Sequence, residues 1–240
     1  MVKDKQGFLY PETEMDTCIQ CGLCETVCPV NNKRIEKEPL GILAAKNKNE
    51  DERFLSSSGG IFVLLANMII EQGGVVFGVR FDEKWHTIHS FVEAKDDLRL
   101  FMGSKYVQSR TEDTFKQAKE FLRKGRPVLF SGTPCQIAGL NNFLGKEYDG
   151  LLTLEVLCHG VPSPRVWEDY LNYINRPQGT IAGENKGLSS LNEMTFIERI
   201  SFRDKQKGWR NEESQYLPRL HVRRGRGRRA RIYGGVHGRR

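Results

Sequence analysis

Four cysteines in the stretch CIQCGLCETVCPV, near the start of the chain, are the residues whose type and spacing most directly suggest chemistry. Cys18, Cys21, Cys24 and Cys28 are separated by two, two and three residues and are followed by proline, which is the iron–sulfur run of bacterial ferredoxins. Three such thiolates can bind one four-iron cluster, and the fourth reaches across to a second cluster. The pattern therefore predicts a second run of cysteines, and the sequence contains none.

The alternative for these residues is a zinc knuckle, but zinc usually takes two separated cysteine pairs. Clustered cysteines in a cytosolic protein also indicate metal binding rather than disulfides.

Cys135 and Cys158 each lie in a Gly/Pro-rich loop after an apolar run, where a small core residue and a cofactor contact are both plausible. His159 is either a proton donor or an ordinary loop histidine. His86 and His89 point to opposite faces of an expected strand and are taken as structural or exposed.

The net charge of +7 suggests a nucleic-acid partner until the charges are located. Residues 210–240 hold ten arginines, two glutamates and no lysine, whereas the remaining chain carries 27 basic and 28 acidic side chains. The basic character therefore belongs to the tail, and the rest gives no electrostatic reason to expect nucleic acid or a membrane surface. No apolar run approaches the ~20 residues of a membrane helix, and the N-terminus lacks a signal region. We therefore expect a cytoplasmic protein.

Helix and strand patterns alternate in the middle of the chain. This alternation favours an α/β fold with a mostly parallel or mixed central sheet flanked by helices, preceded by a small ferredoxin-like iron–sulfur module. Ligands of such sheets bind at the carboxyl ends of strands, so the loops GTPCQ and CHGVPSP are candidate site loops. The expected helices cover residues 61–70, 111–125 and 163–174, and a further helix is opened by the loop at 132–136 and runs to about residue 144. The expected strands cover residues 75–81, 86–94, 126–132 and 151–160.

The segments between these elements define the predicted organisation. Residues 1–32 are the cysteine module, and residues 33–55 are predicted to be a linker with one short strand around Ile42–Ala45. The motif SSSGG (56–60) opens the main domain, and a helix start of this kind suits either a phosphate or simple capping. The Arg/Gly-rich tail at 210–240 has too few large apolar residues to offset its ordering entropy, so we expect it to be disordered.

Four ordered motifs resemble the coenzyme F-420 hydrogenase/dehydrogenase beta-subunit family, and specifically its bacterial branch with a ferredoxin module at the front. Four motifs in order make a chance resemblance improbable, and the resemblance extends over about residues 6–209. The motifs are SSSGGIFVLLANMIIEQGGVVFGVRF, GSKYVQS (103–109), GTPCQIAGL (132–140) and CHGVPSP (158–164).

The resemblance implies an iron–sulfur flavoprotein oxidoreductase that passes electrons between a 4Fe-4S cluster and FAD. Its expected partner is an electron-transfer protein, either a ferredoxin or another reductase or hydrogenase subunit. Use of F-420 itself does not follow. Carried over by motif, the residues that would meet the flavin's phosphates are Ser57, Ser58, Gly59 and Gly60. Those that would line or face the flavin are Gly103, Ser104, Lys105, Tyr106, Thr133, Pro134, Cys135 and Gln136.

The resemblance also implies truncation at both ends. Family members link two cysteine runs through the segment GFLYPE, which here lies at residues 7–12. The first run would then be missing, and the remaining cluster would lack its fourth ligand. Family members also continue past SFRDKQKGW (201–209) with ordinary composition, so we interpret 56–209 as an incomplete flavin-binding domain and the tail as out of frame. The alternative functions are a non-enzymatic ferredoxin-like carrier, and RNA binding through the tail.

Overall fold

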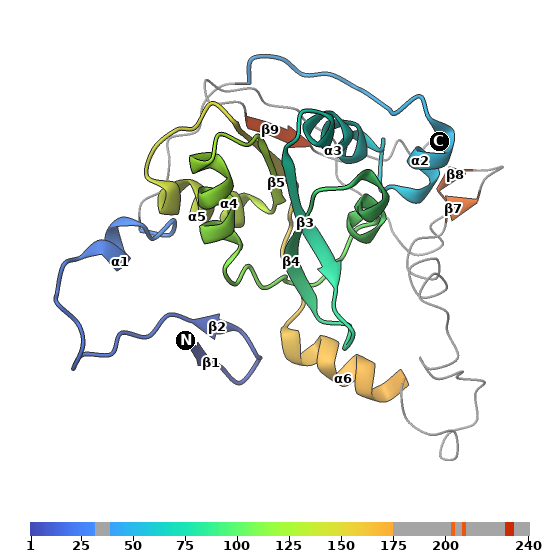
Figure 1. The fold of residues 1–240 in the computed structure, drawn as a ribbon. Helices are drawn as coiled ribbons and strands as arrows, with labels where there is room; N and C mark the ends of the chain where they lie inside the picture. Colours follow the sequence, from blue (N-terminus) through green and yellow to red (C-terminus); the bar gives the residue numbers. More distant parts are fainter. Residues whose placement is uncertain (32–38, 175–202, 205–207, 210–228, 233–240) are drawn as a thin grey trace. The chain divides into compact units, whose positions relative to one another are not determined.

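The fold is described from a computed structural model, which covers residues 1–31, 39–174, 203–204, 208–209 and 229–232. The chain divides into two compact units (Figure 1). The larger unit contains most of the chain between Ile19 and His159, together with a strand from the tail. The smaller unit contains the N-terminal segment Met1–Cys18, the short segment Tyr106–Gln108 and the segment Gly160–Gln215.

The larger unit is built on a five-stranded sheet with the strand order β4-β3-β5-β6-β9. The pairs β3–β5, β5–β6 and β6–β9 are parallel, and β4 runs antiparallel to β3 at one edge. The sequence prediction of a mixed, mostly parallel sheet flanked by helices is therefore confirmed. The strands are β3 (Val75–Phe81), β4 (Thr87–Val92), β5 (Val128–Gly132), β6 (Leu151–Val156) and β9 (Arg229–Ile232).

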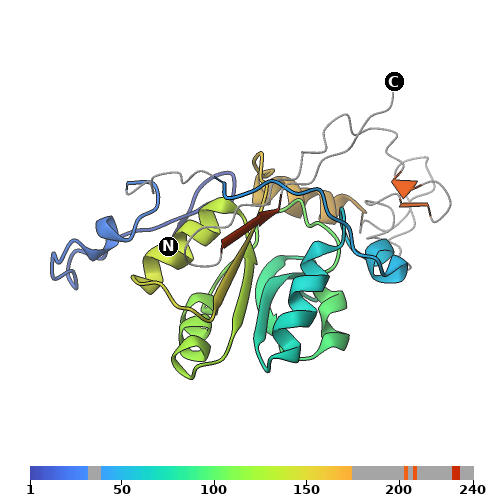
Figure 2. The same ribbon diagram turned by 90° about the horizontal axis from the view of Figure 1, so that it is seen from above.

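Helices cover both faces of this sheet, as Figure 2 shows, because the central strands carry apolar side chains on both sides. On one face Phe77 and Phe130 stack at 5.2 Å and pack with the helices α4 and α5. On the other face Leu129 and Leu154 pack with α3 and the 3-10 helix η1. The helices of this unit are α1 (Leu23–Thr26), α2 (Glu50–Leu55), α3 (Ile61–Glu71), η1 (Lys95–Phe101), α4 (Thr114–Arg123) and α5 (Pro134–Leu144).

The smaller unit is held together by contacts between the N-terminal hairpin and helix α6 (Pro164–Ile174). The backbone N–H of Arg165 donates to the carbonyl of Gln6 at 3.1 Å, and the Lys3 ammonium meets the Glu168 carboxylate at 3.2 Å. Ser163 caps the start of α6, because its hydroxyl accepts from the Val166 N–H at 3.2 Å. The strands of this unit are β1 (Val2–Lys3), β2 (Leu9–Tyr10), β7 (Arg203–Asp204) and β8 (Gly208–Trp209).

One expectation about local structure is wrong, and one short helix was not expected. The short strand expected around Ile42–Ala45 does not form, and the described backbone from residue 39 to residue 49 has no regular secondary structure. Instead, α2 begins directly afterwards, because the Asn49 side chain accepts from the N–H groups of Asp51 and Glu52. This short helix has no apolar stripe that would mark it in the sequence, because it buries none of its residues.

Four residues of the tail form a strand. We expected residues 210–240 to be disordered, but Arg229–Ile232 form β9, which pairs with β6 from Thr153 to Val156. The other tail residues lie outside the described ranges. Strand pairing uses backbone N–H and C=O groups, so an Arg-rich segment can form hydrogen bonds with the edge strand of a sheet. Amino-acid composition alone would not predict this strand.

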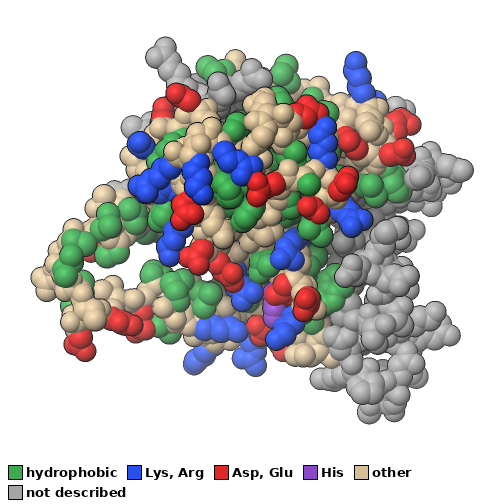
Figure 3. All heavy atoms as spheres, in the orientation of Figure 1, with side chains coloured by type: hydrophobic (Ala, Val, Ile, Leu, Met, Phe, Trp, Pro, Cys, Tyr) green, Lys and Arg blue, Asp and Glu red, His purple; other side chains and the backbone are tan. Residues whose placement is uncertain are grey.

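The described residues carry charges of both signs. On the face drawn in Figure 3, basic and acidic side chains are interspersed, as expected from the nearly equal numbers of both types outside the tail. Within the described ranges, no helix has the length and apolar character needed to cross a bilayer.

Candidate redox site

The cysteine segment is irregular except for α1, which begins at Leu23 after Gly22 in a left-handed conformation with φ of 69°. None of the chain's six cysteines, all in described positions, is disulfide-bonded. Cys21 and Cys24 are exposed, and Cys28 is half-buried. In the described ranges no group of three His, Cys, Asp or Glu side chains is placed to hold a metal ion. The set of four thiols fits an iron–sulfur cluster in chemistry and spacing.

The loop that opens α3 is shaped by close backbone packing. The carbonyl of Gly59 accepts from the Asn47 N–H at 2.7 Å, and a Cβ on Gly59 would lie 2.6 Å from the Ala45 carbonyl oxygen. Gly60 is the N-cap of α3 and has φ of 70°, a conformation that favours glycine. The N-cap glycine has no side chain that could cap α3, and the first N–H groups of a helix can bind an anion.

Asn47 is a buried anchor for this loop and was not recognised in the sequence. Its side chain is 2 % exposed and donates to the Glu52 carboxylate at 2.7 Å. The backbone carbonyl of Asn47 accepts from the Arg53 guanidinium at 2.7 Å. Within the segment predicted to be a linker, Asn47 is therefore bonded both to α2 and to the loop that opens α3.

The GSKY loop lies beside the start of α3. The Ser104 hydroxyl donates to the Ser57 hydroxyl at 2.8 Å, which brings two of the sequence-predicted loops together. The Lys105 ammonium instead donates to the carbonyls of Leu100 and Met102, at 3.2 and 2.9 Å, and so holds the end of η1. Burial lowers the pKa of Lys105 to about 7. In this arrangement Lys105 shapes the loop through backbone carbonyls.

The loop GTPCQ begins α5 directly after β5, as predicted. Thr133 and Gln136 form a capping box, with Pro134 in the first turn. The Thr133 N–H donates to the Gln136 side-chain oxygen at 3.0 Å. The exposed Cys135 thiol lies 3.1 Å from the Thr133 hydroxyl. The capping box therefore holds Cys135 at the surface of the helix start.

Both helix starts lie at the same edge of the sheet. The helix α3 is joined to the beginning of β3 by a tight turn at Gly73 and Gly74, so it runs back along the strand and begins near the strand's carboxyl end. The helix α5 begins at the carboxyl end of β5. This edge is where parallel α/β sheets bind ligands, so the predicted SSSGG and GTPCQ loops are placed in the region that the fold favours.

A hydrogen-bonded chain through His89 links this edge to the GSKYVQS motif. The Gln136 amide donates to the Ser109 hydroxyl at 2.9 Å, and that hydroxyl lies 3.0 Å from His89 Nδ1. His89 Nε2 lies 3.1 Å from the carbonyl of Ser131. Because that carbonyl can only accept, we assign the proton to Nε2, which leaves Nδ1 to accept from Ser109.

His89 is held neutral by this environment. Its side chain is 4 % exposed and stacks on Phe130 at 5.4 Å. Burial lowers its pKa to about 4, against a weaker opposite effect of the Ser131 carbonyl. The expectation of a structural histidine is confirmed. His86 is partly exposed and pairs with the Asp82 carboxylate at 3.4 Å.

Ser109 and His89 were not predicted from the sequence as parts of this edge. Ser109 is the last residue of the motif GSKYVQS, and this position was the one signal in the sequence that could have indicated its role. His89 gave no signal, because its partners lie 20 and 42 residues away in sequence. Of the other sequence candidates, Tyr106 is exposed and belongs to the smaller unit, and Cys158 is half-buried just beyond β6.

Replacing Gln136 with leucine should destabilise the start of α5. The change removes the acceptor of the Thr133 N–H and the donor to Ser109, so we expect a loss of about 1–3 kcal/mol in the free energy of unfolding. Chemical denaturation measures this loss. The matched control is Gln117→Leu on α4, which should change stability by less than ~0.5 kcal/mol. Equal effects of the two changes would contradict the network.

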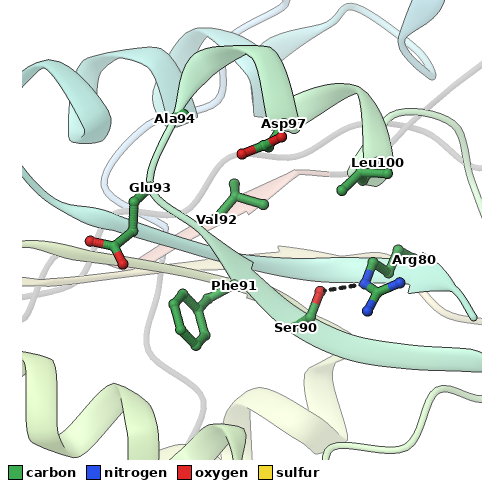
Figure 4. Close-up of a pocket in the computed structure, with 8 residues that line it drawn as sticks. All are labelled: Arg80, Ser90, Phe91, Val92, Glu93, Ala94, Asp97 and Leu100. Carbon is green, nitrogen blue, oxygen red and sulfur yellow. Dashed lines mark hydrogen bonds between the residues drawn. The ribbon is translucent and has the colours of Figure 1, made fainter.

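A separate depression of about 590 Å³ lies along the edge strand β4 (Figure 4). The Arg80 guanidinium donates to Ser90 at 3.0 Å inside it, and Glu93 is paired with Arg126 at 2.6 Å. Asp97 and Leu100 come from η1. None of the residues predicted to bind the flavin lines this depression.

Comparisons with known proteins agree with the cysteine pattern and with the motifs. A 4Fe-4S binding domain family matches residues 11–33. A subunit of the F(420)H(2) dehydrogenase from Methanosarcina mazei is 23 % identical over 121 residues, which make up 50 % of this chain and 34 % of that protein. A solved structure of the F420-reducing NiFe hydrogenase complex from Methanosarcina barkeri aligns with a TM-score of 0.43 and 17 % identity, covering 59 % of this chain and 53 % of that one.

The fold and the cysteine module define the class of the protein, which is an iron–sulfur protein with a 4Fe-4S module and a mixed α/β sheet. The sequence is also similar to the F(420)H(2) dehydrogenase subunit over half of its length. The chain spans about a third of the length of the curated relative that it matches.

Proposed function

We propose that this chain is an iron–sulfur flavoprotein oxidoreductase that passes electrons between a 4Fe-4S cluster and FAD. The observation that carries the proposal is the meeting of sequence-distant motif loops at one edge of the sheet. Ser104 bonds to Ser57 across 47 positions of sequence. Gln136 bonds to Ser109 across 27 positions. Because sheets of this kind bind ligands at this edge, the convergence of these loops supports a cofactor there.

The residues at this edge fit a dinucleotide. The uncapped first turn of α3 offers N–H groups and the positive end of a helix dipole to a phosphate. Gly59 and Gly60 let this turn pack closely against the chain, because a Cβ on Gly59 would lie 2.6 Å from the Ala45 carbonyl oxygen. The hydroxyl groups of Ser57 and Ser104 lie beside the turn. We assign the phosphates to residues 57–60 and the flavin ring to the face between residues 103–105 and the Thr133–Gln136 loop.

The residues of the chain supply position and electrostatics. Bound FAD would exchange two electrons or a hydride, and the cluster would exchange single electrons. The His89 chain fixes the start of α5, and the capping box presents Cys135 there. We expect a separate electron-transfer protein to complete the reaction, and a cytoplasmic location.

A negative charge at the start of α3 should weaken FAD binding. Ser57→Asp places a carboxylate beside N–H groups that we assign to a phosphate, so the Kd for FAD should rise roughly 10-fold or more through repulsion. The matched control is Ser163→Asp, because aspartate also caps helices well and Ser163 caps α6. Both proteins are titrated with FAD and followed by the quenching of flavin fluorescence.

Two outcomes would overturn the assignment. An unchanged Kd in Ser57→Asp would remove residues 57–60 from the site. Absence of FAD binding by the unaltered chain, with a cluster that still accepts and donates electrons, would favour the ferredoxin-like electron carrier.

A further inference from the structure

We propose that Asn142 is a positioning residue that anchors the cluster-binding segment to α5. Its side-chain amide donates to the carbonyl of Val27 at 3.0 Å, across 115 positions of sequence. Val27 is the residue immediately before Cys28, so the bond holds the peptide that leads into the last cysteine. Both residues belong to the larger unit.

The burial pattern of the segment agrees with an anchor at this point. Residues 21–26 are exposed, whereas Val27, Cys28 and Pro29 are half-buried. The same peptide is held on its other side as well, because the Cys28 N–H donates to the carbonyl of Glu25 at 3.3 Å. The segment therefore docks through its last three residues while the thiols of Cys21 and Cys24 stay accessible.

The choice of α5 as the anchor has a functional consequence, which rests on the proposed function. The same helix begins with the loop that carries Cys135, and Asn142 lies seven residues further along it. Seven residues of α-helix rise about 10 Å. A rigid helix therefore fixes the spacing between the cysteine segment and the loop assigned to the flavin.

The experiment measures amide hydrogen exchange in the full chain, kept reduced and free of cluster and flavin. Asn142→Ala removes the donor while placing the best helix former in α5. Loss of one hydrogen bond should speed exchange of the peptide that contains residues 24–30 by roughly 3- to 10-fold. Peptides from β5 and the start of α5 should keep their protection. The matched control, Asn172→Ala near the end of α6, should leave exchange of residues 24–30 unchanged.

A second variant keeps the test sharp. Asn142→Asp has the same shape but turns the donor into a carboxylate that faces the Val27 carbonyl, so exchange of residues 24–30 should be at least as fast as in Asn142→Ala. Its control is Asn172→Asp, which puts the same charge near another helix end. Unchanged exchange of residues 24–30 in both Asn142 variants would overturn the anchor. Because neither cofactor is present, that result would be separate from any failure of FAD or cluster binding.

Discussion

Replacing Cys18 with serine should abolish iron–sulfur binding, whereas Cys28→Ser should change it little. The ferredoxin spacing assigns the first three cysteines to one cluster and the fourth to another. The chain reconstituted under anaerobic conditions should hold less than one stable four-iron cluster per molecule, because only three thiolates serve it. Iron and sulfide content, together with visible absorbance, measure this difference.

The control for the cluster prediction is Cys135→Ser, which removes an exposed thiol outside the segment and should leave iron content unchanged. One result would contradict the assignment of three cysteines to one cluster and the fourth to another. If Cys28→Ser loses the cluster as completely as Cys18→Ser, all four thiolates bind one cluster. The chain would then be a self-sufficient one-cluster module.

His89 should make the protein less stable in mild acid. The unfolded chain takes up a proton on this residue as the pH falls below its usual pKa of 6.5, but the folded chain does so only near pH 4. Unfolding is therefore increasingly favoured between these two values, and the effect is complete below pH 4. At pH 5 the contribution of His89 to the free energy of unfolding should be about 2 kcal/mol lower than at pH 8.

The variant His89→Gln isolates this contribution. Glutamine can still donate to the carbonyl of Ser131 but does not titrate. The variant should be less stable than the unaltered chain at pH 8, because Ser109 loses its acceptor. Its loss of stability between pH 8 and pH 5 should be smaller by about 2 kcal/mol. Denaturant unfolding at the two pH values tests this, and parallel losses in both proteins would contradict a buried neutral His89.

Local patterns in the sequence determined most of the elements in the larger unit. The apolar stretch that ends at Gly73 predicts α3, and the amphipathic pattern around Phe115 and Leu122 predicts α4. Apolar runs predict β3, β5 and β6. Their alternation also predicts the mixed sheet, because strands joined through helices run parallel. The cysteine spacing predicts the 4Fe-4S module, since its ligands all lie within eleven residues.

Only the tertiary structure decided how the candidate site is held together. Asn47, His89 and Asn142 look like ordinary polar residues in the sequence, and each acts through a partner that folding brings close. The partners of His89 come from β5 and from the segment before α4. The anchor of the cysteine segment comes from a helix more than a hundred residues away. Tertiary packing also determines β9, because this strand pairs with β6 through backbone hydrogen bonds. Such pairing depends little on side-chain composition. The period of apolar residues and the spacing of cysteines reflect contacts within one element. A hydrogen bond between distant elements requires only one compatible polar atom on each side, so it leaves no such pattern in the sequence.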